Sequence, residues 1–176
     1  ALDDVSPDIV HVGVTDKGGL GAAAEKPAQL TFHHHNGEEV QAGYNGAAVS
    51  GGILNDIIRT GGHDDVFMTG GEGRDFFTWT GNDLSGGEHN RATITDFNRD
   101  EDVLDLRDLM KAYDKDTSAT LSWDSAQQAL RIEGRMDGVD ASQEIVFHGG
   151  GFAAVESFDD LCNQITVILK STDLAG

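Results

Sequence analysis

The residues best suited to bind a ligand lie at positions 70–78, which read Gly-Gly-Glu-Gly-Arg-Asp-Phe-Phe-Thr. The glycines permit a tight turn with positive φ angles and leave main-chain carbonyl oxygens exposed. Asp75 adds an anionic carboxylate, and Phe77 suits a short strand whose side chain points into a core. Carboxylate and carbonyl oxygens are the ligands that Ca²⁺ prefers in proteins. This spacing therefore indicates a calcium-binding turn followed by a strand.

The same spacing of an aspartate and an inward apolar residue occurs in the neighbouring segments. Residues 51–59 read Gly-Gly-Ile-Leu-Asn-Asp-Ile-Ile-Arg and lose only the third glycine, which is Leu54. Residues 42–50 keep the rhythm with Ala47 in place of the aspartate, so we expect them to form a metal-free first coil. The pairs are Asp56 with Ile58, Asp65 with Phe67 and Asp75 with Phe77, and Asp83 offers a degenerate last turn.

These segments resemble the Gly-Gly-x-Gly-x-Asp-x-hydrophobic-x nonapeptide repeat of RTX proteins. The resemblance implies a mostly β fold that begins with a short parallel β-roll, in which two nonapeptides form one coil and Ca²⁺ lies in the turns. Residues about 18 positions apart then stack on one edge. We therefore expect one site from Asp56 and Asp75 with carbonyls of Gly51, Ile53, Gly71 and Gly73. A second site on the other edge would use Asp65 and Asp83 with carbonyls of Gly61 and His63, the imidazole of His63 taking no part.

Two other interpretations of this stretch explain less. An acidic, glycine-rich surface loop would explain the glycines and the acids, but not the apolar residues that follow three aspartates at the same distance. An EF-hand loop requires Asp-x-Asp-x-Asp-Gly with a glutamate at the twelfth position, and this pattern is absent. The repeats therefore favour calcium binding in stacked turns.

The composition agrees with a chain that needs cations. The formal net charge of the 176 residues is -19, which repels nucleic acid and anionic lipid and opposes compaction until cations bind. No segment approaches the roughly 20 apolar residues of a membrane span, and we expect neither membrane insertion nor an N-terminal signal peptide in this segment. Cys162 is the only cysteine, so no intrachain disulfide can form, and we expect it in the core. A bound metal ion is then the obvious means of stabilising a secreted fold that has no disulfide.

Other candidate sites are weaker. His33, His34 and His35 precede Glu38 and Glu39, but adjacent histidines on a strand point to opposite faces and cannot all bind one Zn²⁺ or Ni²⁺ ion without a loop. The HExxH, GxSxG and P-loop motifs are absent, and so is any Cys-His signature, so we expect no enzymatic activity. Trp79 and Trp123 are expected to pack in or beside the core.

Periodicity places the remaining elements. Alternating apolar residues predict strands at 9–14, 30–32, 92–97, 103–106, 121–123, 129–133 and 144–148, with 121–123 and 129–133 paired. A flexible link is expected at 18–24, a turn region at 134–140 and a break at 149–151. Helical spacing predicts helices at 107–113 and 157–169, the second with Phe158, Leu161, Ile165 and Ile168 or Leu169 on one face, and a mobile tail at 171–176.

A second resemblance covers roughly residues 51–150. The repeats, followed by Ile94-Thr95-Asp96-Phe97-Asn98 and by residues 102–109 (Asp-Val-Leu-Asp-Leu-Arg-Asp-Leu), are similar to the C-terminal target domain of RTX proteins exported by type I secretion, especially those that end giant Gram-negative surface adhesins. Serralysin-type proteases and mannuronan epimerase modules carry a similar roll. The chain departs from the pattern in its short repeat array, Leu54, the shifted Asp65 turn and Asp83, which puts the second site in doubt.

This resemblance implies three regions: lead-in strands at 1–41, the roll at 42–90, and a secretion target region at 91–176 with antiparallel strands and one or two short helices. It implies a monomeric, non-catalytic folding and export module of a secreted or cell-surface protein. Its partners would be an ABC transporter, a membrane fusion protein and an outer-membrane channel. Two alternatives stay open: the same module attached to a secreted protease, lipase or epimerase, and a Ca²⁺-dependent ligand-binding domain to which residues 1–45 contribute.

Overall fold

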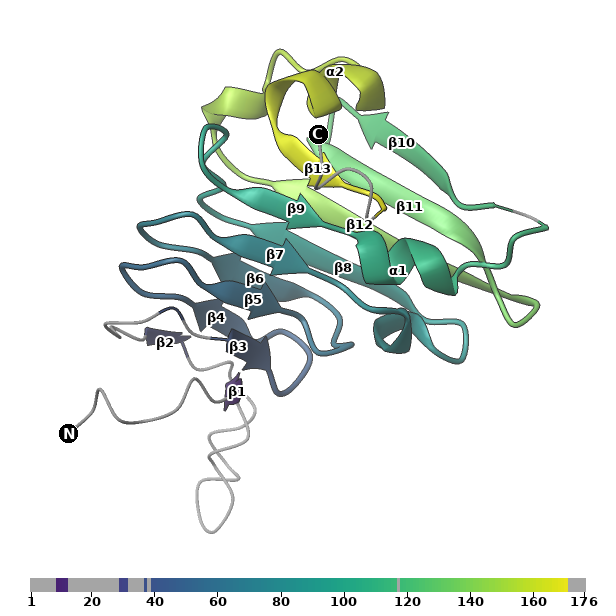
Figure 1. Cartoon of the computed structure of the whole chain (residues 1–176), viewed down its shortest axis with the longest axis horizontal. Helices are drawn as coiled ribbons and strands as arrows, with labels where there is room; N and C mark the ends of the chain where they lie inside the picture. Colours follow the sequence, from purple (N-terminus) through teal and green to yellow (C-terminus); the bar gives the residue numbers. More distant parts are fainter. Residues whose placement is uncertain (1–8, 13–28, 32–36, 38, 117, 171–176) are drawn as a thin grey trace, which may run out of the picture.

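The computed structural model describes residues 9–12, 29–31, 37, 39–116 and 118–170. Within them the fold is mostly β, as the sequence predicts, with two short α-helices, α1 (Arg107–Ala112) and α2 (Phe158–Gln164). The strands form two sheets, here called sheet A and sheet B, which enclose a common core (Figure 1). No helix in the described part of the chain is long and apolar enough to cross a membrane.

Between residues 39 and 105, here called the coiled segment, the chain passes from one sheet to the other strand by strand. Neighbouring strands of each sheet run parallel in this segment. Val40 lies opposite Ile58, and Ile58 opposite Phe77, so the first two coils take 18 and 19 residues; Phe77 lies opposite Leu104, so the third takes 27. Sheet A contains β3 (Glu39–Ala42), β5 (Ile57–Arg59), β7 (Phe76–Thr78) and β9 (Val103–Asp105), and sheet B contains β4 (Ala48–Ser50), β6 (Val66–Thr69) and β8 (His89–Ile94). β1 (Ile9–Val12) and β2 (Gln29–Thr31) extend sheets A and B on the N-terminal side.

The coil forms because each short strand sends one or two apolar side chains between the sheets. In β3, Val40 and Ala42 are buried while Glu39 and Gln41 are partly exposed. Successive side chains of a strand point to opposite faces, so this alternation leaves polar groups outside. The inward side chains of the coiled segment are Val40, Ala42, Val49, Ile58, Val66, Met68, Phe77, Ala92, Ile94 and Leu104, all fully or almost fully buried. Val49 follows Ala47 by two residues, as the metal-free first coil requires.

The C-terminal part of the chain extends both sheets. β12 (Val139–Phe147) pairs with β8 in parallel, and β11 (Ala129–Met136) and β10 (Thr120–Asp124) continue sheet B as antiparallel strands. β13 (Thr166–Ile168) pairs in parallel with β9 and becomes the last strand of sheet A (Figure 1). Two 3₁₀ helices, η3 (Gly81–Leu84) and η4 (Gly150–Phe152), lie in the connections.

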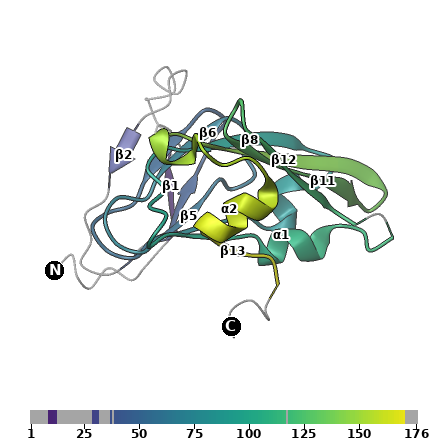
Figure 2. The same ribbon diagram turned by 90° about the horizontal axis from the view of Figure 1, so that it is seen from above.

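Helix α2 closes the end of the core that is opposite β1 and β2. It contacts both β10 and β13, and Figure 2 shows it beside β13. Leu161 is fully buried, and Ile165, directly after the helix, is nearly so. The rings of Phe97, Phe147 and Phe152 pack against one another in this region, with centroids 4.7–6.2 Å apart. The coil is thus capped by an aromatic cluster and a short helix.

Several predicted elements are confirmed with small shifts. The strand at 103–106 is β9, the helix at 107–113 is α1, and the paired strands are β10 and β11. The strand expected at 92–97 begins earlier, at His89, and ends at Ile94. The strands expected at 9–14 and 30–32 correspond to β1 and β2 where the structure describes them. The expectations for residues 18–24, His33–His35 and residues 171–176 lie outside the described residues.

The long helix expected over residues 157–169 is wrong. Helix α2 ends at Gln164, and Thr166–Ile168 form a strand. The segment 165–168 is Ile-Thr-Val-Ile, whose β-branched side chains favour strands, and β9 offers an open edge. Pairing is tight there, because the N–H of Leu106 donates to the carbonyl of Ile168 at 2.8 Å. Cys162, expected in the core, lies on the exposed side of α2.

The turn expected over residues 134–140 is much shorter. β11 continues to Met136 and β12 begins at Val139, so the turn consists of Asp137 and Gly138. Both have positive φ angles, 50° and 79°, as a two-residue hairpin turn of type I′ requires. The carboxylate of Asp114 accepts both turn N–H groups at 2.9 Å, which fixes the hairpin from outside.

Candidate metal site

Three aspartates form a ladder along one edge of the coiled segment. They end the turns at 51–56, 70–75 and 95–102, which connect strands of sheet B to strands of sheet A. The N–H of Asp56 donates to Oδ1 of Asp75 at 2.9 Å, and the N–H of Asp75 donates to Oδ1 of Asp102 at 3.0 Å. The expected pairing of Asp56 with Asp75 is therefore confirmed, and Asp102 adds a third member.

Asp102 carries the same sequence signal as the other two. Leu104 follows it by two residues and is fully buried, as Ile58 follows Asp56 and Phe77 follows Asp75. It is nevertheless 27 residues from Asp75, instead of the 19 that separate Asp56 from Asp75. The longer connection between β7 and β8, which contains η3, moves this aspartate out of the nonapeptide rhythm.

Each outer aspartate of the ladder also closes its own turn. Oδ2 of Asp56 accepts the N–H of Gly52 at 2.7 Å, and Oδ2 of Asp102 accepts the N–H of Asn98 at 2.8 Å. In both cases the donor lies four residues before the aspartate. These bonds give each outer carboxylate a local partner.

The middle aspartate lacks this local bond because Asp96 takes its donor. The residue four before Asp75 is Gly71, whose N–H donates to Oδ2 of Asp96 at 2.9 Å, while the N–H of Gly70 donates to Oδ1 of Asp96 at 2.8 Å. Oδ2 of Asp75 is buried and has no hydrogen-bond partner among the described residues. An anionic oxygen without a partner in a fully buried side chain calls for a cation or a proton.

The electrostatics of the ladder point the same way. Burial, and to a smaller degree the neighbouring carboxylates of Asp102, Asp56 and Asp96, raise the pKa of Asp75 to about 7, although the N–H of Asp56 opposes the shift. Burial also raises the pKa of Asp102, with smaller contributions from Asp96 and Glu101. A column of carboxylates that cannot all ionise easily by themselves is a favourable place for a divalent cation.

Carbonyl oxygens of one turn lie close to glycines of the next, and only glycine fits at these positions. A Cβ at Gly51 would lie 2.5 Å from the carbonyl oxygen of Gly70 and closer still to Oδ2 of Asp56. Gly71, at φ +96°, lies against the carbonyl of Gly52, and a Cβ at Gly73, at φ +109°, would lie 2.8 Å from the carbonyl oxygen of Leu54. The side chain of Ile53 is exposed. Because this side chain is a hydrocarbon, only the main-chain oxygen of Ile53 could act as a ligand.

The donor set fits Ca²⁺ better than a transition metal. No three His, Cys, Asp or Glu side chains of the described residues are grouped so that they could hold a metal ion. A site on this edge therefore needs main-chain carbonyl oxygens beside the carboxylates of Asp56 and Asp75, which is the chemistry of Ca²⁺ with its roughly six to eight oxygen ligands. The oxygens that this edge offers are the unpaired Oδ2 of Asp75, the carboxylate of Asp56 and the carbonyl oxygen of Gly70.

The opposite edge differs from the prediction. Asp65 is exposed with a φ of 57°, and Phe67, expected inside, is 39% exposed. Val66 and Met68 point inward instead. The turns at 60–65 and 70–75 both have six residues, but β6 buries its first and third residues whereas β7 buries its second. The first inward side chain therefore follows Asp65 by one position and Asp75 by two, and a shift of one residue turns every side chain of a strand to the other face. Asp64 therefore takes the place two residues before an inward side chain.

Asp83 lies beside the turn at 61–63, where the side-chain amide of Asn90 donates to the carbonyls of both Gly62 and Asp83, at 3.2 and 3.1 Å. It lies in η3, where its Oδ2 accepts the N–H of Thr80 at 2.8 Å, and burial raises its pKa. The next residue along this edge is Arg91, whose N–H donates to Oδ1 of Asp64 at 2.7 Å.

Gly61 and His63, expected to contribute carbonyl ligands, belong to the same turn as Asp65. The edge has no ladder of aspartates like that formed by Asp56, Asp75 and Asp102 in the described residues. Of the two predicted sites, the structure stacks the aspartates of the first, whereas in the second Asp83 lies beside the turn at 61–63 with its carboxylate bonded to the N–H of Thr80.

The tryptophans pack as predicted. Trp79 is almost fully buried, and Trp123 is half-buried and donates its indole N–H to the carbonyl of Val155 at 2.9 Å.

Comparisons with known proteins add no assignment. No protein-family model matches the chain, and no curated protein matches it either.

Proposed function

We propose that this chain is a non-catalytic module that folds around calcium and serves the export of a large secreted or cell-surface protein by type I secretion. The observation that carries the proposal is the buried carboxylate of Asp75, whose Oδ2 lacks a partner among the described residues within a ladder of aspartates and crowded carbonyl oxygens. The resemblance of residues 51–150 to RTX target domains supports the export role.

Calcium would be held by carboxylate oxygens of Asp56 and Asp75 and by main-chain carbonyls of the turns at 51–56 and 70–75. Asp96 and Asp102 extend the acidic edge on the C-terminal side. Bound calcium would supply the positive charge that cancels the repulsion of these carboxylates. On this proposal, the fold is a short parallel β-roll with calcium in the turns of one edge.

The same physics explains how calcium would control export. A chain with a net charge of -19 and an uncompensated acidic ladder folds poorly when calcium is scarce, as in the cytosol. Sites of extracellular calcium modules have dissociation constants of roughly 10⁻⁴–10⁻³ M. Calcium that binds only the folded form adds about 1.4–2.7 kcal/mol per site at ten- to a hundredfold saturation. Such a gain decides folding in a marginally stable domain. The chain would thus cross the exporter unfolded and fold outside.

Export is tested by placing the chain at the C-terminus of a soluble reporter in a Gram-negative host that carries a type I exporter. We expect the reporter in the medium when the ABC transporter is active and in the cytosol when its ATPase is inactivated. A reporter that stays inside in both strains contradicts the export role. Calcium binding is measured on the purified chain, so the two parts of the proposal can fail separately.

A further inference from the structure

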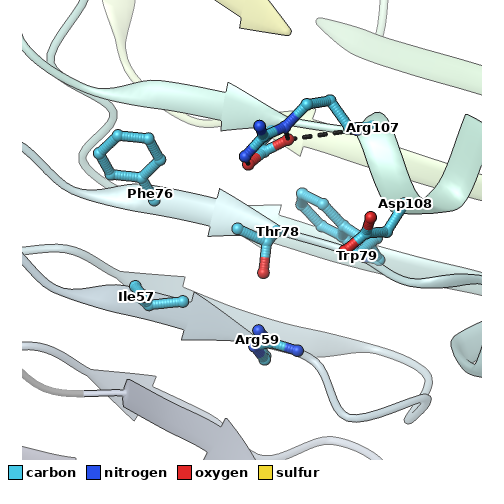
Figure 3. A pocket seen from close by; sticks show the side chains of 8 residues that line it. Ile57, Arg59, Phe76, Thr78, Trp79, Arg107 and Asp108 are labelled. Atoms are coloured by element: carbon cyan, nitrogen blue, oxygen red, sulfur yellow. Dashed lines mark hydrogen bonds and ion pairs between the residues drawn. The ribbon is translucent and has the colours of Figure 1, made fainter. Parts of the chain in front are cut away.

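The outer face of sheet A carries a concavity of about 320 Å³ whose lining includes none of the aspartates of the ladder. Its lining comes from β5, β7, the end of β9 and the start of α1. Figure 3 shows Arg59, Thr78, Arg107 and Asp108 around the opening, with Ile57 and Phe76 side by side at one end. All of these residues belong to the described part of the chain.

Two parallel rows of side chains form the floor of this concavity. Ile57 and Phe76 are partners in the register of β5 and β7 and make an apolar row. Arg59, Thr78 and Asp105 are partners in the next outward row, two residues further along each strand. Side chains of neighbouring strands lie about 4.8 Å apart, so the rows present a flat apolar shelf beside a line of hydrogen-bonding groups.

The shelf is accessible from solvent. Ile57 is 38% exposed and Phe76 is half-buried, although both are apolar and lie in the middle of a sheet. The guanidinium carbon of Arg74 lies over the Phe76 ring, 5.7 Å from its centre, so this side chain covers the ring face that a flat ligand would use. A ligand that stacks on Phe76 would displace the exposed side chain of Arg74.

The charges around the concavity are already compensated. Nε of Arg59 lies 2.6 Å from Oε1 of Glu39, and Arg107 makes a bidentate pair with Asp105 at 2.9 and 2.6 Å. Hydrogen bonding to Asp105 also raises the pKa of Arg107, which stays protonated. Asp108 adds an exposed carboxylate. Because the pairs cancel and the chain has a net charge of -19, an anionic ligand gains little here.

The hydrogen-bonding groups that remain are both donors and acceptors. A guanidinium has five N–H groups, and the pair with Asp105 uses two different nitrogens of Arg107. Oγ1 of Thr78 is buried and has no hydrogen-bond partner among the described residues. Asp108 supplies acceptor oxygens. A ligand with an apolar face and several hydroxyl groups would satisfy this mixture.

From this geometry we propose that the outer face of sheet A binds a neutral sugar. One face of a pyranose ring lies on Phe76 and Ile57, and its hydroxyl groups bond to Arg59, Thr78 and Asp108. The size of the concavity suits one ring of a saccharide that continues along the sheet. This proposal does not depend on calcium binding at the aspartate ladder or on export.

The test uses the full chain in excess calcium on an array of neutral oligosaccharides together with their uronate and sulfated counterparts. Calorimetry then gives the dissociation constant of the best neutral binder. We expect Phe76→Ala to weaken binding about tenfold, because a stacked ring contributes roughly 0.5–1.5 kcal/mol beyond its buried area. Thr78→Val, which keeps the shape and removes the hydroxyl group, should weaken binding as well, and Arg74→Ala should not.

Phe67→Ala is the matched control, since Phe67 is an exposed phenylalanine on a strand of sheet B. It should leave the dissociation constant unchanged, and circular dichroism confirms that each variant is folded. The proposal is overturned if no neutral sugar binds, if only charged sugars bind, or if Phe76→Ala and Thr78→Val bind like the parent chain.

Discussion

Replacing Asp75 by asparagine should have opposite effects with and without calcium. In the metal-free fold, burial and neighbouring carboxylates raise the pKa of Asp75 from 3.8 to about 7. Each pKa unit corresponds to about 1.4 kcal/mol, so the ionised side chain destabilises the metal-free fold by on the order of 4 kcal/mol above pH 7. Asparagine removes this charge and still accepts the N–H of Asp56 through its amide oxygen.

The new amide leaves its own N–H groups without partners, which costs about 1–3 kcal/mol. In chelator at pH 8, Asp75→Asn should therefore be more stable than the parent chain by about 1–3 kcal/mol. The folded-state pKa lies above the unfolded-state value. The destabilisation is therefore absent below about pH 4, grows between about pH 4 and pH 7, and is complete above that range. The advantage of the variant should shrink accordingly at pH 5.

In calcium the order should reverse, because the variant lacks an anionic ligand. The parent chain should gain about 1.4–2.7 kcal/mol per occupied site at ten- to a hundredfold saturation, and Asp75→Asn should gain much less. Urea denaturation followed by circular dichroism, in chelator and in calcium at pH 5 and pH 8, measures all four free energies of unfolding. Asp140→Asn, at an exposed position, is the control and should change stability by less than about 0.5 kcal/mol. A variant that is less stable than the parent in chelator at pH 8 would refute the reasoning.

Three further predictions concern residues that shape the turns. Asp96→Ala releases the N–H of Gly71, which can then bond to Asp75. We expect the free energy of unfolding, measured in denaturant, to fall by about 1–3 kcal/mol, and calcium binding in titration calorimetry to weaken. An unchanged calcium affinity would contradict the role given to Asp96. Gly71→Ala places a Cβ against a carbonyl at a positive φ angle and should lower the free energy of unfolding by more than about 2 kcal/mol. Gly86→Ala, at a positive φ angle in open space, should lower it clearly less. Equal decreases for the two variants would argue against crowding at Gly71. Asp114→Ala removes two hydrogen bonds from the hairpin turn. It should lower the free energy of unfolding by about 1–3 kcal/mol to the same extent with and without calcium. A calcium-dependent effect would link this hairpin to the aspartate ladder.

Local spacing was sufficient to predict that Asp56 and Asp75 stack on one edge. Asp56 and Asp75 are 19 residues apart and each is followed by an inward apolar residue, so the repeat carried both the position of the strands and their stacking. The prediction failed where the inward positions shifted or residues were added. In β6 the inward side chains are those of the first and third residues, so Phe67 points outward, and the insertion that forms η3 hid Asp102 from the nonapeptide pattern.

The C-terminal strand could not be predicted from periodicity. Leu161, Ile165 and Ile168 are all buried, and their spacing suits a helix as well as a helix followed by a strand. The outcome depends on β9, which lies far away in the sequence and offers an edge for parallel pairing. The bond network that frees Oδ2 of Asp75 also joins three turns, so no single segment reveals it.

In our proposal, calcium binds the aspartate ladder and drives folding of the coiled segment. Far-UV circular dichroism of the purified chain, titrated from chelator to excess Ca²⁺ with Mg²⁺ in parallel, tests it most directly, with Asp75→Ala as the companion variant. We expect a sharp gain of β signal with Ca²⁺, none with Mg²⁺, and a weakened response in the variant. A spectrum that is already rich in β structure in chelator and does not respond to Ca²⁺ would contradict the claim.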